Sequence, residues 1–266
     1  DGMIIVSTGT TQKRYLIEAK IGNNTLEFEQ IEKYQILCKE HKLDGVITIS
    51  NQFASKVSHH PLEKIRKGKL KIPVFHWSWM YLLTVVDLLI NSQNIEDKSQ
   101  YFLINELRRF MSHESTGIQG FDRMPSEWTE LNKIVQAGGN IPTKSEIATE
   151  VVMAWHQETK DLTLILSRLT NTMVNTKLPQ KLTNKPDNRL KADLALLKNE
   201  NKLVSNIDIP GAAASIEIIA DIKGRTFHVG MTIGAPEDRK SSVARVNWLI
   251  RQIKTEDIDD LVLRIN

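Results

Sequence analysis

The sequence contains a single cysteine, Cys38, among its 266 residues. An intrachain disulfide and a cysteine-based zinc cluster are therefore excluded, and a reducing compartment such as the cytoplasm is the expected location. Long apolar runs are also missing. The most apolar window, 73–90, is interrupted by His76 and Asp87 and is barely long enough to cross a bilayer. It predicts a core strand followed by a core helix, with no membrane contact.

A strong excess of charge of one sign is missing as well. The net charge of +3 and the isoelectric point near 8.8 permit a polyanionic partner without requiring one. Hydrophobic residues at 41% and charged residues at 25% are typical of a folded globular protein, which argues against intrinsic disorder. No Gly-rich phosphate loop and no Ser-His-Asp arrangement is evident, so the sequence gives no support to an ATPase or a serine hydrolase.

The first half of the chain predicts an α/β arrangement. Short runs rich in Ile and Val alternate with amphipathic segments, in the order strand, strand, helix, strand, strand, helix, helix. The corresponding ranges are 2–7, 14–21, 26–42, 46–50, 73–76, 77–90 and 98–111. This order predicts a mixed central sheet flanked by helices.

A segment rich in glycine marks the expected domain boundary. Residues 137–142 concentrate the residue types that end helices and start turns, so we expect a first domain over 1–136, a linker over 137–142 and a smaller α+β domain over 143–266. The elements expected in the second domain are a helical hairpin over 143–175, a β-hairpin over 215–233, a covering helix over 241–253 and a final strand over 261–266. Because the chain begins without methionine and ends within that strand, both ends are expected to be cut from a longer protein.

The second predicted strand carries an acid and an ammonium group in otherwise apolar sequence. Side chains alternate along a strand, so Glu18 and Lys20 point to the same face. A strand covered by helices on both faces tolerates charge only when that charge is paired or bound to an ion. On the following helix, Gln30 and Tyr34 lie one turn apart and can both reach back to the strand.

Together with Asp1, these residues resemble the PD-(D/E)XK nuclease superfamily and, within it, the RecB-type nucleases. The family pattern is an Asp at the start of a strand, then an acid and a Lys separated by one residue on the next strand, then a helix with Gln and Tyr four apart. The sequence matches this pattern in order and residue type, over about its first fifty residues, at Asp1, Glu18-Ala19-Lys20, Gln30 and Tyr34. The proline and the acidic helix that usually precede the first Asp would lie upstream of Asp1.

The resemblance implies a restriction-endonuclease-like fold and a bound Mg²⁺, with Mn²⁺ as an alternative metal. The carboxylates of Asp1 and Glu18 and the carbonyl of Ala19 would hold the cation. Elementary chemistry supports this choice, since Mg²⁺ is commonly held by one or two carboxylates and neighbouring strands lie about 4.8 Å apart. Asp1 also has a second interpretation, as an ordinary turn residue before Gly2.

The remaining site residues would act on water and phosphate. In the family pattern Lys20 orients or activates water and counters charge in the transition state. Gln30 and Tyr34 would position Lys20 or a DNA phosphate without binding the metal.

Two groups of cations are candidate contacts to nucleic acid. They are Lys64, Arg66, Lys67 and Lys69 in the loop before the fourth strand, and Arg245 and Arg251 on the last predicted helix. Each group has two interpretations, as phosphate contacts or as an exposed solvated face.

Two further motifs are given structural interpretations. His59 and His60 precede Pro61 without a partner at ligand spacing, so they are predicted to lie in a solvated loop and not in a metal site. Trp77 and Trp79 open an apolar helix and are predicted to belong to the core and not to a base-stacking surface.

The sequence therefore predicts a metal-dependent deoxyribonuclease that hydrolyses phosphodiester bonds. DNA is the expected partner, in a defence, restriction or repair setting, and a homodimer or a larger defence or repair complex is compatible with this function. The alternative is the same fold acting as a non-catalytic module that binds nucleic acid or protein.

Overall fold

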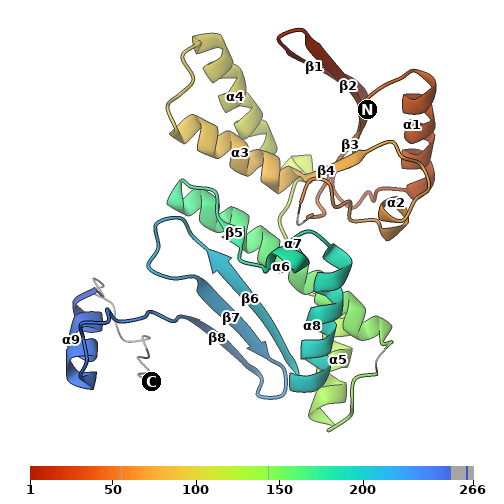
Figure 1. Cartoon of the computed structure of the whole chain (residues 1–266). Coiled ribbons are helices and arrows are strands. Elements are labelled where there is room, and N and C mark those ends of the chain that lie inside the picture. The colour runs from red at the N-terminus through yellow and green to blue at the C-terminus, as the bar shows by residue number, and fades with distance from the viewer. Residues whose placement is uncertain (55, 143, 253–261, 263–266) are drawn as a thin grey trace. The chain divides into compact units, whose positions relative to one another are not determined.

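The computed structural model describes every residue except 55, 143, 253–261 and 263–266. The chain divides into two compact units, residues 1–230 and 231–266. The larger unit is built from one mixed sheet and one antiparallel sheet with helices packed against them (Figure 1), which confirms the predicted mixed α/β class. The final strand predicted over 261–266 falls almost entirely outside the described residues.

The first half of the chain forms the predicted elements in the predicted order. They are β1 (Gly2–Thr8), β2 (Thr11–Ala19), α1 (Phe28–Glu40), β3 (Gly45–Ser50), β4 (Val74–Ser78), α3 (Trp79–Asn91) and α4 (Lys98–Met111). The structure adds a short helix α2 (Glu63–Arg66), a 3-10 turn η1 (Glu114–Thr116) and a helix α5 (Ser126–Gln136), none of which the sequence predicted. The apolar window 73–90 is β4 followed by α3, as expected.

The first sheet has the strand order β1-β2-β3-β4. β1 pairs with β2 antiparallel, whereas β2 and β3, and β3 and β4, pair parallel. Every residue of β3 is buried, because this strand lies inside the sheet and is covered on both faces. β1 is an edge strand, and its apolar side chains from Met3 to Val6 are exposed.

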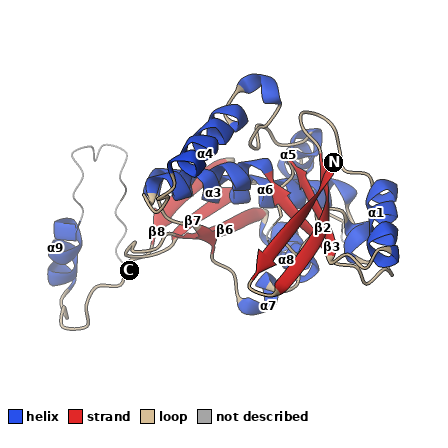
Figure 2. Cartoon of the chain, turned by 90° about the horizontal axis from the view of Figure 1, so that it is seen from above, coloured by secondary structure: helices blue, strands red, loops and turns tan. Residues whose placement is uncertain are grey.

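Helix α1 packs along β2 and β3 (Figure 2). Its Ile31 and Cys38 are completely buried, and the Cys38 thiol donates to the carbonyl of Gly45 at the start of β3. Helix α3 begins at Ser78, whose side chain accepts a hydrogen bond from the main-chain N–H of Tyr81 and so caps the helix. A separate core of Phe53, Met80, Leu83, Met111 and Leu164 joins α3 to a later helix, α6 (Glu146–Thr170).

The helical hairpin predicted over 143–175 is wrong. A single helix, α6 (Glu146–Thr170), occupies most of this range. The predicted break between the two helices, at 157–160, contains no Gly or Pro. Its Thr159 hydroxyl donates to the carbonyl of Trp155 one turn earlier, and Gln157 and Asp161 bind main-chain groups of neighbouring loops, so the helix continues.

The second half contains an antiparallel sheet that packs against α6. The elements are β5 (Asn175–Thr176), α7 (Gln180–Thr183), α8 (Pro186–Glu200), β6 (Lys202–Asp208), β7 (Ile216–Asp221), β8 (Thr226–Met231) and α9 (Ser242–Gln252). The predicted pair of strands and the last helix are confirmed, whereas α8 and β6 were not predicted. The largest core lies between α5, α6, α8 and this sheet, with Leu131, Val151, Leu197 and Ile207 almost fully buried.

The linker predicted over 137–142 lies between α5 and α6, inside the larger unit. Ile141 is buried in the core beside Val151, and the Gln136 amide donates to the carbonyl of Ile222. Within the described ranges, no helix combines the length and the apolar character needed to cross a membrane.

Candidate active site

Glu18 and Lys20 lie at the end of β2 and form an ion pair. Lys20 Nζ is 2.8 Å from Glu18 Oε1, and the Glu18 side chain is only 1% exposed. The Lys20 ammonium and the Tyr34 hydroxyl face this carboxylate, but among the described residues neither of its oxygens accepts a hydrogen bond of good geometry. A buried carboxylate is costly unless paired, so Glu18 depends on Lys20 or on a further cation.

Lys20 is fixed by its neighbours at both its side chain and its main chain. Its ammonium donates to Gln30 Oε1 at 3.1 Å. Its main-chain N–H donates to Ile49 O on β3, and its carbonyl accepts from the indole N–H of Trp79, both at 2.8 Å. The position of the ammonium beside Glu18 is therefore set by β3, α1 and α3 together.

Tyr34 links Asp1 to the Glu18 carboxylate. Its hydroxyl donates to Asp1 Oδ2 at 3.1 Å. Burial and the nearby Glu18 carboxylate raise the pKa of Tyr34, which keeps the phenol protonated and able to donate. The β1–β2 register pairs Gly2 with Ile17, and one further step along it places Asp1 opposite Glu18. The structure thus brings together all five predicted side chains.

The donor set at this point is two carboxylates and one carbonyl. The Lys20 N–H points to β3, and because the peptide is trans and planar, the Ala19 carbonyl points the other way, toward β1. Among the described residues no group of three or more His, Cys, Asp or Glu side chains forms a metal site. One or two carboxylates with water filling the remaining positions is a usual arrangement for Mg²⁺, so Asp1, Glu18 and Ala19 fit this cation.

A second polar group lies in the same row of the sheet. The register pairs Glu18 with Thr48, and Thr48 with His76. The Thr48 hydroxyl is 2.9 Å from His76 Nδ1 and 3.0 Å from His60 Nε2. His60 is 1% exposed, so its predicted place in a solvated loop is wrong: its Nδ1 accepts from Leu62 N, which ties the loop to the sheet.

Burial keeps both of these rings neutral. It lowers the pKa of His60 to about 3 and that of His76 to about 4. Because His60 Nδ1 accepts, Nε2 carries the proton and donates to Thr48; His76 Nε2 donates to the carbonyl of Gln52 at 2.8 Å. Each ring has a partner at both nitrogens, so this group acts as a polar part of the core.

The predicted basic loop is partly engaged in contacts of its own. Lys64 lies over the ring of Phe28 at the start of α1, with its ammonium 5.7 Å from the ring centroid. Arg66 donates to the carbonyls of His60 and Pro61 and pairs with Asp187. Lys67 pairs with Glu63, and Lys69 is exposed. Of the two cations on α9, both exposed, Arg245 donates to the carbonyl of Arg239.

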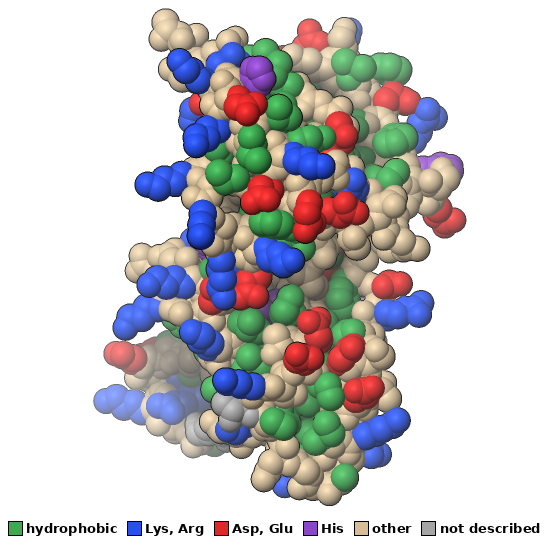
Figure 3. Space-filling view, turned by 90° about the vertical axis from the view of Figure 1, so that its right-hand side faces the viewer, with side chains coloured by type: hydrophobic (Ala, Val, Ile, Leu, Met, Phe, Trp, Pro, Cys, Tyr) green, Lys and Arg blue, Asp and Glu red, His purple; other side chains and the backbone are tan. Residues whose placement is uncertain are grey.

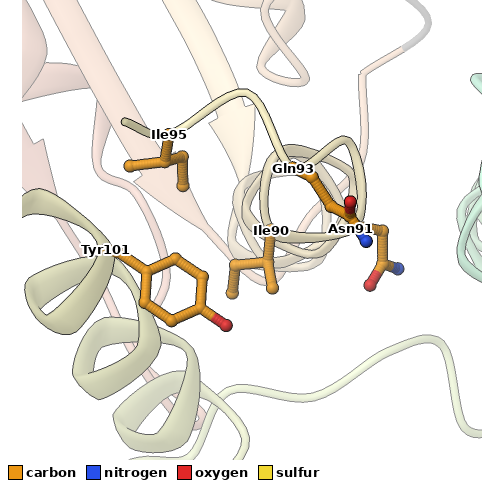
Figure 4. Close-up of a pocket in the computed structure, with 5 residues that line it drawn as sticks. All are labelled: Ile90, Asn91, Gln93, Ile95 and Tyr101. Atoms are coloured by element: carbon orange, nitrogen blue, oxygen red, sulfur yellow. The ribbon is translucent and has the colours of Figure 1, made fainter. Parts of the chain in front are cut away.

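The side of the surface drawn in Figure 3 carries charges of both signs. On the side of the molecule seen in Figure 3, Lys and Arg side chains intermingle with Asp and Glu. A pocket lies between the end of α3 and the start of α4, lined by Ile90, Asn91, Gln93, Ile95 and Tyr101 (Figure 4). The lining consists of two aliphatic side chains, two amides and one phenol, so it includes no carboxylate, imidazole or ammonium group.

Two supporting residues had no clear signal in the sequence. Trp79 was predicted as core, but its N–H also holds the carbonyl of Lys20. Asn51, directly after β3, donates to the carbonyls of Gly22 and Gly117 and so joins the loop after β2 to the loop after α4. An asparagine at the carboxyl end of a central strand was the only indication of this role.

Comparison of this chain with models of protein families, with curated proteins and with solved structures found no match.

Proposed function

We propose that this protein is a Mg²⁺-dependent nuclease that hydrolyses phosphodiester bonds in DNA. One observation carries the proposal: the Glu18 carboxylate is almost completely buried and, among the described residues, is faced by the Lys20 ammonium and the Tyr34 hydroxyl without a well-aligned hydrogen bond. Such a group gains from a second cation. The connection from Asp1 through Tyr34 adds a second carboxylate where a metal would be needed.

Asp1, Glu18 and the Ala19 carbonyl would hold the cation. Bound Mg²⁺ would neutralise charge on the phosphate and lower the pKa of water. Mn²⁺ has the same preference for oxygen ligands and is expected to replace it.

The protein's own residues would position the reacting groups. The Lys20 ammonium, held by Gln30, lies beside the carboxylate and can donate to a non-bridging phosphate oxygen or to the attacking water. Tyr34 keeps the Asp1 carboxylate oriented toward the site through its hydroxyl. Gln30 and Tyr34 act as positioning residues, since each reaches the site through another side chain.

The arrangement of the first sheet supports a restriction-endonuclease-like fold. An antiparallel hairpin, β1–β2, is followed by a helix and by two strands that extend the sheet in parallel. The acid and the lysine stand at the end of β2, as in the PD-(D/E)XK pattern. A role in defence, restriction or repair, alone or as a homodimer or larger complex, follows from that resemblance.

The test is cleavage of supercoiled and linear DNA with Mg²⁺, using Glu18→Gln and Lys20→Met. We expect either substitution to lower the rate by 10² or more, since each removes a group at the reacting centre. Glu29→Gln and Lys13→Met are matched controls at exposed positions of α1 and β2 and should cleave like the parent. DNA left intact by the parent, but still bound, would instead favour the non-catalytic binding module.

A further inference from the structure

A second cluster of charge lies between α6 and α8, on residues that the proposed nuclease reaction does not use. Arg189, in the first turn of α8, is 6% exposed. Its Nε forms no hydrogen bond with any described group. The carboxylate that faces it, Asp193, is 3.6 Å from Nε, which is too far for a hydrogen bond.

The Asp193 carboxylate is already engaged. The same oxygen, Oδ2, is 2.6 Å from Nε2 of His156 on α6. One oxygen therefore serves both the imidazole and the guanidinium. Arginine has five N–H donors, so a buried Arg189 keeps donor capacity that Asp193 does not use.

Lys160 brings a second cation to the same place. It lies one turn after His156 on α6 and is partly buried. Among the described residues its ammonium has no hydrogen bond and no ion pair. Burial, and then the charge of Arg189, lower the pKa of Lys160, so the two cations lie near enough to repel each other.

Charged residues of both signs lie around these two cations. The loop after β3 reaches α7 and α8 through Lys56, which donates to Asn184 Oδ1 at 2.8 Å, and through Arg66, which pairs with Asp187. α8 begins nearby, and no side chain caps its N-terminus. The Asp187 carboxylate in the first turn of α8 offsets the positive end of the helix dipole, so the charge of the site comes from Lys160 and Arg189 themselves.

We propose that Lys160 and Arg189 form a binding site for a phosphoryl group. A guanidinium binds two phosphate oxygens through its planar fork, and an ammonium supplies a further donor and a point charge. Asp193 offsets part of the charge of Arg189, and a phosphoryl group with one to two negative charges would balance the remainder and accept from the donors that Asp193 does not use. The group could be carried by a nucleic-acid strand or by a free nucleotide or phosphate, and the chemistry of recognition is the same.

This site is separate from Glu18 and Lys20 and stands whether or not the protein is a nuclease. It also differs from the basic residues predicted from the sequence. Lys160 and Arg189 are 29 residues apart and lie on different helices, so no run of basic residues marks them.

The experiment measures phosphate binding and its effect on stability. Inorganic phosphate is titrated into the full chain by calorimetry, and unfolding midpoints are recorded with and without it. Lys160→Gln and Arg189→Gln should each weaken binding at least tenfold and remove the thermal shift. Lys191→Gln, at an exposed position of α8, is the matched control and should bind like the parent.

The unfolding midpoint in phosphate-free buffer shows whether Lys160 serves to bind the anion or to stabilise the fold. In phosphate-free buffer Lys160→Gln should unfold at the same temperature as the parent or higher, because it removes repulsion from Arg189. Unchanged phosphate affinity in Lys160→Gln, no binding by the parent, or a lower midpoint for Lys160→Gln in phosphate-free buffer would each overturn the proposal. If Arg189→Gln fails to fold, Lys160→Gln alone decides the test.

Competition identifies what carries the phosphoryl group. Inorganic phosphate is displaced with a mononucleotide and with one oligonucleotide, prepared with and without a 5′-phosphate. Displacement by both oligonucleotides indicates an internal phosphate, by the phosphorylated one alone a strand end, and by the mononucleotide alone a free nucleotide. The same titration on Glu18→Gln should give the parent affinity, so loss of nuclease activity and loss of this site are distinguishable.

Discussion

Gln157 on α6 binds both main-chain groups of Phe53, which follows β3 by three residues. Its Oε1 accepts from Phe53 N at 2.6 Å, and its Nε2 donates to Phe53 O at 2.8 Å. The two residues are 104 positions apart. A single side chain therefore fixes the loop that leaves the central sheet to a helix from the second half of the chain.

Replacing Gln157 should loosen this connection. Gln157→Ala leaves the N–H and carbonyl of Phe53 without their partner, which typically costs about 1–3 kcal/mol when such groups are buried. Denaturant unfolding of the variant should show this loss as a lower midpoint with an unchanged slope. Gln100→Ala, on exposed α4, is the control and should leave the midpoint in place. Equal midpoints for the two variants would show that the loop is held by its apolar packing alone.

The same contact explains why the predicted domain boundary differs from the compact units of the structure. The sequence predicted a break between two helices near Gln157, with Asp161 at the start of the second helix. In the structure they satisfy the main chain at Phe53 and Phe121, which are distant in sequence. Hydrophobic periodicity reports which face of a helix is buried, but it does not report polar contacts made across a hundred residues.

The candidate site was easier to predict because its contacts are nearly local. Lys20 and Gln30 are only ten residues apart, at the end of a strand and on the helix that follows it. The alternation typical of the strand and the helical spacing of apolar residues were both clear in the sequence. Trp79 contributes through its N–H from 59 residues away, and only its apolar character was visible in the sequence. Helix α8 was missed because Lys177 to Asn188 is polar and contains two prolines, although Pro186 suits the first turn of a helix.

Metal binding should be visible as stability as well as activity. If Asp1, Glu18 and Ala19 hold Mg²⁺ in the folded chain only, adding it at ten times its dissociation constant should stabilise the protein by about 1.4 kcal/mol. The measurement is the unfolding midpoint against Mg²⁺ concentration. Glu18→Gln should show no such rise, while the Glu29→Gln control should follow the parent. A rise of equal size in Glu18→Gln would place the metal elsewhere.

Trp79→Phe tests whether the main chain of Lys20 must be held. The substitution keeps an aromatic ring but removes the N–H that binds the Lys20 carbonyl. We expect about a tenfold lower cleavage rate, on the scale of one misplaced catalytic group, with the Mg²⁺ dependence unchanged. Trp77→Phe is the matched control on β4, since the indole of Trp77 has no hydrogen bond among the described groups. Equal rates for the two variants would show that the sheet alone positions Lys20.

The buried pair His60 and His76 should make the fold sensitive to acid. Their pKa values in the folded chain, about 3 and about 4, lie below the ordinary value of 6.5, so below pH 6.5 the unfolded chain binds more protons than the folded one. Their contribution to stability is therefore complete above pH 6.5 and is lost as the pH falls toward 4. Each ring should lower the free energy of unfolding by on the order of 2 to 3 kcal/mol between pH 7 and pH 4.5.

The free energy of unfolding, measured by denaturant across this range, should fall less steeply in His76→Gln, which cannot take up the proton. His41→Gln, at an exposed position after α1, is the control, and its free energy of unfolding should depend on pH as in the parent. Identical slopes for His76→Gln and the parent would mean that the ring is solvated, and the hydrogen bonds from Thr48 and to Gln52 would then not be maintained in solution.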